Sequence, residues 1–234
     1  MEAKYKRILL KISGESLAGD KRHGFSTDAL TATAKQIAKL NKLGVEIGVV
    51  VGGGNFWRGR EGDEMDRTTA DYMGMLATVI NALAISDALE RLGVESRVMT
   101  AFAIDKIGEQ YNIKTAKRYL SEGKVVVFGG GTGNPFFSTD TGASLRACEI
   151  NAEVLLLAKN IDGIYDSDPK TNPNAKKFDK LTYDEYVARG LKALDTSAVI
   201  MCKENGLKIH AFGNTGDQSI VDAVCSSTAG TVVY

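Results

Sequence analysis

The chain has 234 residues, of which 44% are hydrophobic and 25% are charged, as is usual for a globular protein. Its 29 Lys and Arg residues balance its 29 Asp and Glu residues, so the chain lacks the positive charge of a dedicated nucleic-acid-binding protein. No apolar run approaches the roughly 20 residues of a membrane-spanning helix, and the first residues make a poor secretion signal. We therefore expect a cytoplasmic protein without membrane or nucleic-acid partners.

The cysteines and histidines do not suggest a disulfide framework or a protein-held metal. Cys148, Cys202 and Cys225 are odd in number and form no Cys-x-x-Cys pair, which fits packing roles in a reducing compartment. His23 and His210 are the two histidines of the sequence, too few for a histidine-rich metal site.

Apolar runs of strand length alternate with segments of helical periodicity along the whole chain. Strands are predicted, in chain order, at residues 6–13, 45–51, 94–101, 124–130, 153–158, 207–212 and 230–234. Helices are predicted between them at residues 26–44, 67–92, 113–123, 139–150, 193–206 and 217–227. This order, with nearly continuous apolar strands, predicts a single α/β domain over residues 1–234: a three-layer αβα sandwich around a mostly parallel, twisted sheet.

The helix predicted at residues 67–92 is apolar on more than one side. Leu76, Ile80 and Leu83 share one face, whereas Met75 lies off it. Such a helix is either deeply buried or lies at a subunit interface.

Three predicted strands end in glycine, within the stretches Lys11–Ser16, Val49–Gly59 and Val125–Pro135. In open α/β sheets ligands gather at the carboxyl ends of strands, and glycine allows backbone N–H groups to face an anion directly. Neither the GxxxxGK[ST] pattern nor a complete GxGxxG fingerprint occurs. The three loops together favour a phosphate-binding edge of another kind, although each could also be a tight turn without a ligand.

Charged residues lie close to the first two glycine loops: Lys11 precedes Gly14, and Arg58 and Asp71 follow the second loop. Lys11 stands where an ammonium could bridge two phosphates and offset the charge on a transferring phosphoryl group, or it could be a solvated strand-end lysine. Arg58 offers a guanidinium fork suited to phosphate, or a surface ion pair. Asp71 could accept from ribose hydroxyls, or simply be a charge at a helix start.

The third glycine loop leads into hydroxyl, amide and aromatic side chains. Thr132, Asn134 and Ser138 supply neutral hydrogen-bonding groups, and Phe136 with Phe137 supplies rings that could pack on a planar base or belong to the core. Asp140 follows at a predicted helix start. Its carboxylate could orient a lysine or Mg²⁺, or it could cap the helix.

A segment at residues 160–185 interrupts the alternation of strands and helices, and an insertion of that length is usually functional. Its Tyr165 offers a ring, while Asp166 and Asp168 could bind ribose hydroxyls or a metal, or form surface turns. Asp195 begins the next predicted helix and could also be a helix cap.

These residues together resemble the amino-acid-kinase superfamily and, within it, the bacterial uridylate kinases. The resemblance spans essentially the whole chain, through "YKRILLKISGE", "IGVVVGGGNFWRG", "DYMGMLATVINALAISDAL", "GTGNPFFSTD", "NIDGIYDSDP" and "LTYDEY". The stretches "MGMLAT" and "GTGNPFF" are specific to uridylate kinases, whereas the glycine and lysine pattern is shared with carbamate, aspartate and acetylglutamate kinases.

The resemblance implies that ATP, carrying Mg²⁺, donates its γ-phosphoryl group to UMP and gives UDP and ADP in pyrimidine nucleotide biosynthesis. Catalytic roles would fall to Lys11, Asp140, Asp195 and Arg58. Residues that would bind ATP are Lys11, Ile12, Ser13, Gly14, Gly54, Arg58, Lys159, Asn160, Tyr165 and Asp168. Residues that would bind UMP are Gly53, Arg58, Asp71, Thr132, Gly133, Asn134, Pro135, Phe136, Phe137, Ser138 and Thr139. Residues 1–155 would mainly bind UMP and form the oligomer, and residues 156–234 would mainly bind ATP.

The resemblance also implies a homohexamer, activated by GTP and inhibited by UTP, but this sequence departs from the pattern in places. Lys159 replaces a threonine found in many relatives, so it could contact phosphate instead of the nucleoside. Ser86 and Glu90 stand where the enterobacterial pattern has basic residues in the segment tied to GTP, whereas Arg97 is retained.

Two other functions stay open on the sequence. A kinase of the same superfamily could act on a carboxylate or carbamate, although it would not need the "GTGNPFF" rings or Asp71. A nucleotide sensor or storage protein could keep the fold without turnover, although the retention of Lys11, Asp140 and Asp195 speaks against this.

Overall fold

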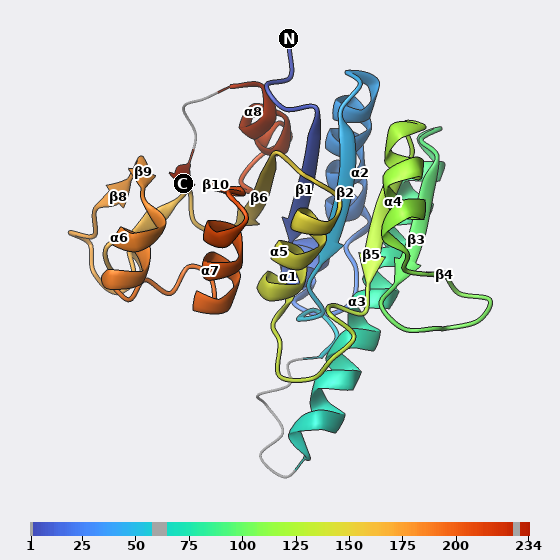
Figure 1. The fold of residues 1–234 in the computed structure, drawn as a ribbon, viewed down its shortest axis with the longest axis horizontal. Coiled ribbons are helices and arrows are strands. Elements are labelled where there is room, and N and C mark those ends of the chain that lie inside the picture. Colours follow the sequence, from blue (N-terminus) through green and yellow to red (C-terminus); the bar gives the residue numbers. More distant parts are fainter. Residues whose placement is uncertain (1, 58–64, 227–229) are drawn as a thin grey trace.

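A computed structural model describes residues 2–57, 65–226 and 230–234 of the chain (Figure 1). Within these residues one sheet of nine strands has the order β4-β3-β5-β2-β1-β6-β10-β11-β9. The strands of this sheet are β1 (Arg7–Ile12), β2 (Glu46–Val51), β3 (Ser96–Thr100), β4 (Glu109–Gln110), β5 (Val125–Gly129), β6 (Val154–Lys159), β9 (Lys180–Leu181), β10 (Lys208–Gly213) and β11 (Thr231–Val233).

The predicted mostly parallel sheet is confirmed. Every described neighbouring pair in the large sheet is parallel except β10 with β11. Strand β1 lies between β2 and β6, and its Lys11 is opposite Val50 on one side and Leu157 on the other. The carboxyl ends of β1, β2, β5 and β6 therefore meet at one edge, which is the lower edge in Figure 1.

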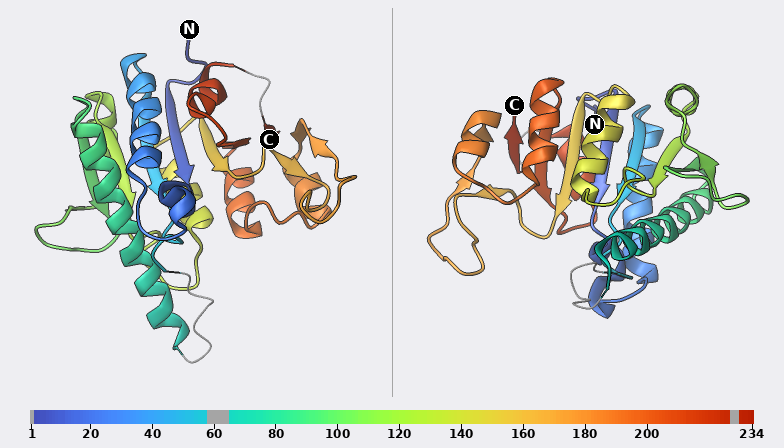
Figure 2. Two further views of the ribbon diagram at one scale, coloured as in Figure 1. Left: turned by 180° about the vertical axis from the view of Figure 1, so that it is seen from behind. Right: turned by 60° about the horizontal axis from the view of Figure 1, so that its bottom comes forward.

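Helices cover both faces of the sheet, as the three-layer prediction requires (Figure 2). The helices are α1 (Gly14–Ala18), α2 (Thr27–Lys42), α3 (Arg67–Glu90), α4 (Ile113–Ser121), α5 (Thr139–Glu149), α6 (Tyr183–Ala188), α7 (Thr196–Glu204) and α8 (Ser219–Cys225), with a 3-10 turn at Gly19–Lys21. Alternating strand residues divide the core. Ile8, Leu10 and Ile12 pack with α2, α3 and α8, whereas Leu9 packs in the cluster that contains α4, α5 and α7.

The segment at residues 160–185 has more regular structure than its sequence predicts. It contains the antiparallel pair β7 (Ile164–Tyr165) and β8 (Lys177–Phe178), then β9 and the start of α6, at one side of the molecule. Helix α6 begins with a capping box in which Thr182 accepts from the Glu185 N–H and Glu185 accepts from the Thr182 N–H. That Thr-x-x-Glu spacing was the available sequence signal for the helix.

Helix α3 is apolar on two sides, but the residues that the structure describes cover only one of them. Ala82, Ile85 and Leu89 are buried against the sheet, whereas Leu76 and Ile80 are nearly half exposed. Among the described helices, α3 is the one long and apolar enough to cross a membrane, and 50% of its most apolar window is buried inside the protein. This burial is typical of a core helix. The interface expected on its exposed side remains a prediction.

All three cysteines are free, and each packs in or against a hydrophobic core cluster. Burial raises the pKa of the Cys202 thiol to about 12, so this thiol stays protonated at neutral pH. The packing interpretation of the cysteines is confirmed.

Candidate active site

The first two glycine loops touch each other at the carboxyl edge of the sheet. A Cβ atom on Gly14 would lie 2.6 Å from the Gly52 carbonyl oxygen and 2.3 Å from Oδ1 of Asn55. A side chain at position 14 would therefore force the loops apart, and glycine is required there for close approach. The third loop meets the same region through α3, because the Gly130 N–H donates to Thr78 Oγ1 at 2.8 Å.

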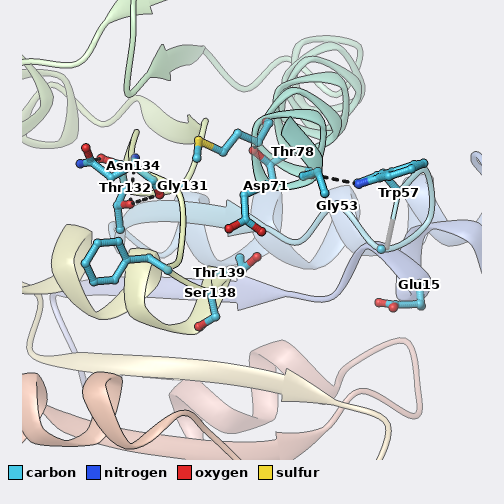
Figure 3. Close-up of a pocket in the computed structure, with 15 residues that line it drawn as sticks. Glu15, Gly53, Trp57, Asp71, Thr78, Gly131, Thr132, Asn134, Ser138 and Thr139 are labelled. Carbon is cyan, nitrogen blue, oxygen red and sulfur yellow. Dashed lines mark hydrogen bonds between the residues drawn. The ribbon is translucent and has the colours of Figure 1, made fainter. Parts of the chain in front are cut away.

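A cavity of about 480 Å³, here called the acceptor cavity, opens between the second and third glycine loops and α3 (Figure 3). Predicted UMP-binding residues that line it are Gly53, Asp71, Thr132, Asn134, Phe137, Ser138 and Thr139, and Gly54 from the predicted ATP set lines it too. Sequence reasoning missed Glu15, Trp57 and Thr78, which also line this cavity. The predicted residues Gly133, Pro135 and Phe136 lie on the adjoining loop and do not line this cavity.

Asp71 connects α3 to the third glycine loop. Its Oδ2 accepts from Arg67 Nε at 2.9 Å and from the Phe136 N–H at 2.7 Å. The start of the helix is instead capped by Asp66, which accepts from the Thr69 N–H. The alternative that Asp71 is merely a charge at the helix start is therefore wrong, and Figure 3 shows its carboxylate between the two loops.

The phenylalanine pair lies at the surface. Phe136 is 66% exposed and Phe137 is 54% exposed, so the alternative of plain core residues is wrong. The backbone of Phe136 has a φ of 70°, which is uncommon for a large residue, and the Arg67 guanidinium lies 5.3 Å from its ring centroid. The rings are thus available to a ligand, as a contact with a base or sugar requires.

Lys11 and Asp140 form an ion pair where β1 ends and α5 begins. Lys11 Nζ lies 2.9 Å from Asp140 Oδ1, and their side chains are only 16% and 18% exposed. Helix α5 is capped by Ser138, whose Oγ accepts from the Thr141 N–H at 3.2 Å. Both simpler interpretations, a solvated Lys11 and an Asp140 helix cap, are therefore wrong.

Lys159 and Asp195 complete a cluster of charges with this pair. Lys159 Nζ donates to the Ala193 carbonyl oxygen. Burial lowers the pKa of the Lys159 ammonium, the nearby Lys11 lowers it further, and Asp140 and Asp195 oppose the shift. Asp195 occupies the cap position of α7, but its side chain makes no capping hydrogen bond. We call Lys11, Asp140, Lys159 and Asp195 the charged centre.

A second cavity of about 500 Å³, here called the donor cavity, lies beside the charged centre and is lined by Lys159. Predicted Tyr165 and Asp168 also line it, together with Arg189 and Lys192, which sequence reasoning missed. The Tyr165 hydroxyl donates to Asp162 Oδ1 at 2.6 Å, and Asp168 Oδ1 accepts from the Lys170 N–H at 2.9 Å. Asp168 therefore shapes a turn, as its alternative interpretation proposed, while also facing this cavity.

Residues 6–213 match the amino acid kinase family. The chain belongs to this family. Its fold is similar to UMP kinase from Bacillus anthracis, with a TM-score of 0.91 and 35% identity over 98% of this chain and 96% of that one. UMP kinase from Ureaplasma parvum is similar with a TM-score of 0.92 and 36% identity over 98% and 99% of the two chains. Uridylate kinase from Archaeoglobus fulgidus has a TM-score of 0.75 and 27% identity over 97% and 99%.

The remaining predicted site residues of this amino acid kinase differ in how they are placed. Arg58 lies outside the described residues. Ile12 is fully buried as a residue, its carbonyl oxygen accepts from the Gly52 N–H, and it lines neither cavity. Ser13 caps α1 by accepting from the Ser16 N–H, and the exposed Asn160 follows β6 outside the lining of the donor cavity.

Proposed function

We propose that this protein transfers the γ-phosphoryl group of ATP to UMP, giving UDP and ADP. The observation that carries the proposal is the Lys11–Asp140 ion pair at the sheet edge. Asp140 directly follows Thr139, which lines the acceptor cavity, and Lys159 of the same charged centre lines the donor cavity. Membership of the amino acid kinase family and the similarity to UMP kinases over nearly the whole chain support it.

UMP would occupy the acceptor cavity and ATP the donor cavity. Asp71 would face the ribose hydroxyls of UMP, and the loop from Thr132 to Thr139 would surround its base. Tyr165 and Asp168 would contact the adenosine of ATP. The acceptor cavity is built from residues 15–139 and the donor cavity from residues 159–193, which supports the division into a UMP half (1–155) and an ATP half (156–234).

Transfer needs alignment and charge compensation more than proton removal. A UMP phosphate oxygen would attack the γ-phosphorus of ATP, and the bond from that phosphorus to the β-bridging oxygen would break, leaving ADP. No general base is required because the attacking phosphate is already an anion. Lys11 would offset negative charge on the transferring group, and Asp140 would hold the Lys11 ammonium in position.

The carboxylates of the charged centre fit a magnesium ion that arrives with ATP. Mg²⁺ in kinases is usually held by one or two carboxylates together with the phosphates of the substrate. Asp195, whose side chain makes no capping bond, is the candidate ligand, since Asp140 is engaged by Lys11. When bound, the ion would neutralise charge on the donor phosphates.

We also propose that the enzyme is a cytoplasmic homohexamer of pyrimidine nucleotide biosynthesis that responds to UTP and GTP. The exposed apolar side of α3, with Leu76 and Ile80, supports an association between copies. Ser86 is buried and forms a hydrogen bond with Ser96, so the segment that was tied to GTP is here part of the α3–β3 packing. Sedimentation and effector titrations would test these points.

The proposed reaction is tested by measuring ADP release with UMP, CMP, dUMP and aspartate as acceptors. We expect turnover with UMP and strong preference over the other three. Turnover with aspartate would favour a carboxylate kinase, and tight UTP binding without any turnover would favour a nucleotide sensor.

Replacing Lys159 with methionine should stabilise the free protein while weakening ATP use. Burial lowers the pKa of Lys159, so its charge destabilises the fold at neutral pH. We expect Tm to rise at neutral pH and KM for ATP to rise several-fold, as thermal unfolding and steady-state kinetics would measure. The buried ammonium destabilises the fold only while it is charged. The gain in Tm should therefore shrink as pH rises toward 10.5, the ordinary pKa of a lysine. A Tm below that of the wild type at neutral pH would contradict the prediction.

A further inference from the structure

A buried pair of amides lies behind the second glycine loop. Asn81 of α3 is fully buried, and Asn55 of the loop is 1% exposed. Asn81 Nδ2 donates to the Gly52 carbonyl oxygen at 2.6 Å and to Asn55 Oδ1 at 2.7 Å. Asn55 Nδ2 donates to the Gly24 carbonyl oxygen at 2.9 Å and to Asn81 Oδ1 at 3.0 Å. All four amide hydrogens of the pair therefore have acceptors.

Backbone hydrogen bonds within the protein account for part of the polar groups of this loop. The Gly52 N–H donates to the Ile12 carbonyl oxygen, and the Gly53 carbonyl oxygen accepts from the N–H groups of Phe56 and Trp57. Among the residues that the structure describes, the Gly53 N–H has no protein acceptor, although Gly53 lines the acceptor cavity. A backbone donor in this position requires a partner from ligand or water.

The Asn81 contact determines where that donor points. In a planar trans peptide the carbonyl and the following N–H point in opposite directions. The Gly52 carbonyl oxygen accepts from Asn81 Nδ2 and therefore points toward the Asn81 side chain of α3. The N–H of the same peptide, which belongs to Gly53, therefore points away from Asn81. Gly53 also lies tight against α3, since a Cβ there would be 2.8 Å from the Gly74 carbonyl oxygen. Helix α3 and the Asn81 side chain together thus hold the Gly52–Gly53 peptide in one orientation.

We propose that Asn81 is a positioning residue that orients the Gly52–Gly53 peptide so that the Gly53 N–H binds the phosphate of the acceptor nucleotide. The inference rests on the proposed function, because it takes UMP as the occupant of the acceptor cavity. Asn81 touches no ligand itself. It acts through the peptide, so its loss affects the phosphate of UMP and spares the nucleoside.

The experiment compares the Kd of UMP with the Kd of uridine, which lacks the phosphate, by calorimetry on wild type and variants. Asn81→Asp keeps the shape of the side chain but places an acceptor oxygen against the Gly52 carbonyl. Gln36→Glu is the matched control, because Gln36 of α2 is also a buried amide that bonds the backbone, at Gly216 and Ile220, and lines neither cavity.

We expect Asn81→Asp to raise the Kd of UMP by about tenfold or more and to leave the Kd of uridine unchanged, with both constants unchanged in Gln36→Glu. An equal rise for UMP and uridine, or no rise for UMP, would overturn the proposal. If Asn81→Asp does not fold, the Kd of UMP and the Kd of uridine are compared in Asn81→Ala, with Gln36→Ala as its control. Wild-type protein that fails to bind UMP would instead refute the proposed function, so the two failures are distinct.

Discussion

Replacing Lys11 with alanine is expected to lower kcat for UMP phosphorylation by about 10²- to 10⁴-fold. The ammonium of Lys11 is held by Asp140 at the carboxyl edge of the sheet, and in the proposed mechanism it offsets the negative charge of the transferring phosphoryl group. The loss should appear in kcat with little change in Tm, because the fold depends on the strand packing around Lys11 and not on its charge. Steady-state kinetics and thermal unfolding of the same preparation measure both quantities.

Lys203→Ala is the matched control for this experiment. Lys203 of α7 also forms an ion pair, with Asp184 of α6, but this pair is exposed and lies outside the lining of either cavity. Exposed ion pairs contribute little to stability, so kcat and Tm should stay close to their wild-type values. Equal kcat in Lys11→Ala and Lys203→Ala would remove Lys11 from the transfer step.

Replacing Asp140 with asparagine is expected to lower kcat on the order of 10²-fold, because the Lys11 ammonium is still present but is no longer held in position. Without the carboxylate, Lys11 loses its ion-pair partner and is repelled by the nearby Lys159, so the Lys11 ammonium no longer keeps its position. The KM for UMP should change little, because Asp140 does not line the acceptor cavity. Asp184→Asn, which removes the anion of the exposed pair, serves as the control.

A double variant separates this explanation from two independent contributions. If Asp140 acts by holding Lys11, then Lys11→Ala combined with Asp140→Asn should be about as slow as Lys11→Ala alone. If the fold-losses in kcat of the two single variants multiply in the double variant, Asp140 acts on the nucleotide or its metal directly. The positioning role assigned to Asp140 would then be wrong.

Local signals in the sequence predicted most of the framework correctly. Strand-length apolar runs and helical periodicity placed the main strands and long helices, because those patterns reflect burial on one or both faces of an element. The short elements were missed where the pattern was too brief, as at α1 (Gly14–Ala18), or where a capping signal stood inside a polar segment, as at α6 (Tyr183–Ala188). Glycine at the ends of three strands identified the candidate ligand-binding edge, because close approach between backbone segments requires glycine at those positions.

The sequence by itself determined the layered fold, the glycine-rich edge and the candidate residues Lys11, Asp71 and Asp140. Only the tertiary structure decided their partners: Asp140 pairs with Lys11, Asp71 accepts from the Phe136 N–H 65 residues away, and Asn81 holds the Gly52 carbonyl. These contacts depend on strand order, which places β1 between β2 and β6, and on the path of α3 across the strand ends. Periodicity reports which face of an element is buried, but the neighbour on that face is set by packing between segments far apart in the chain.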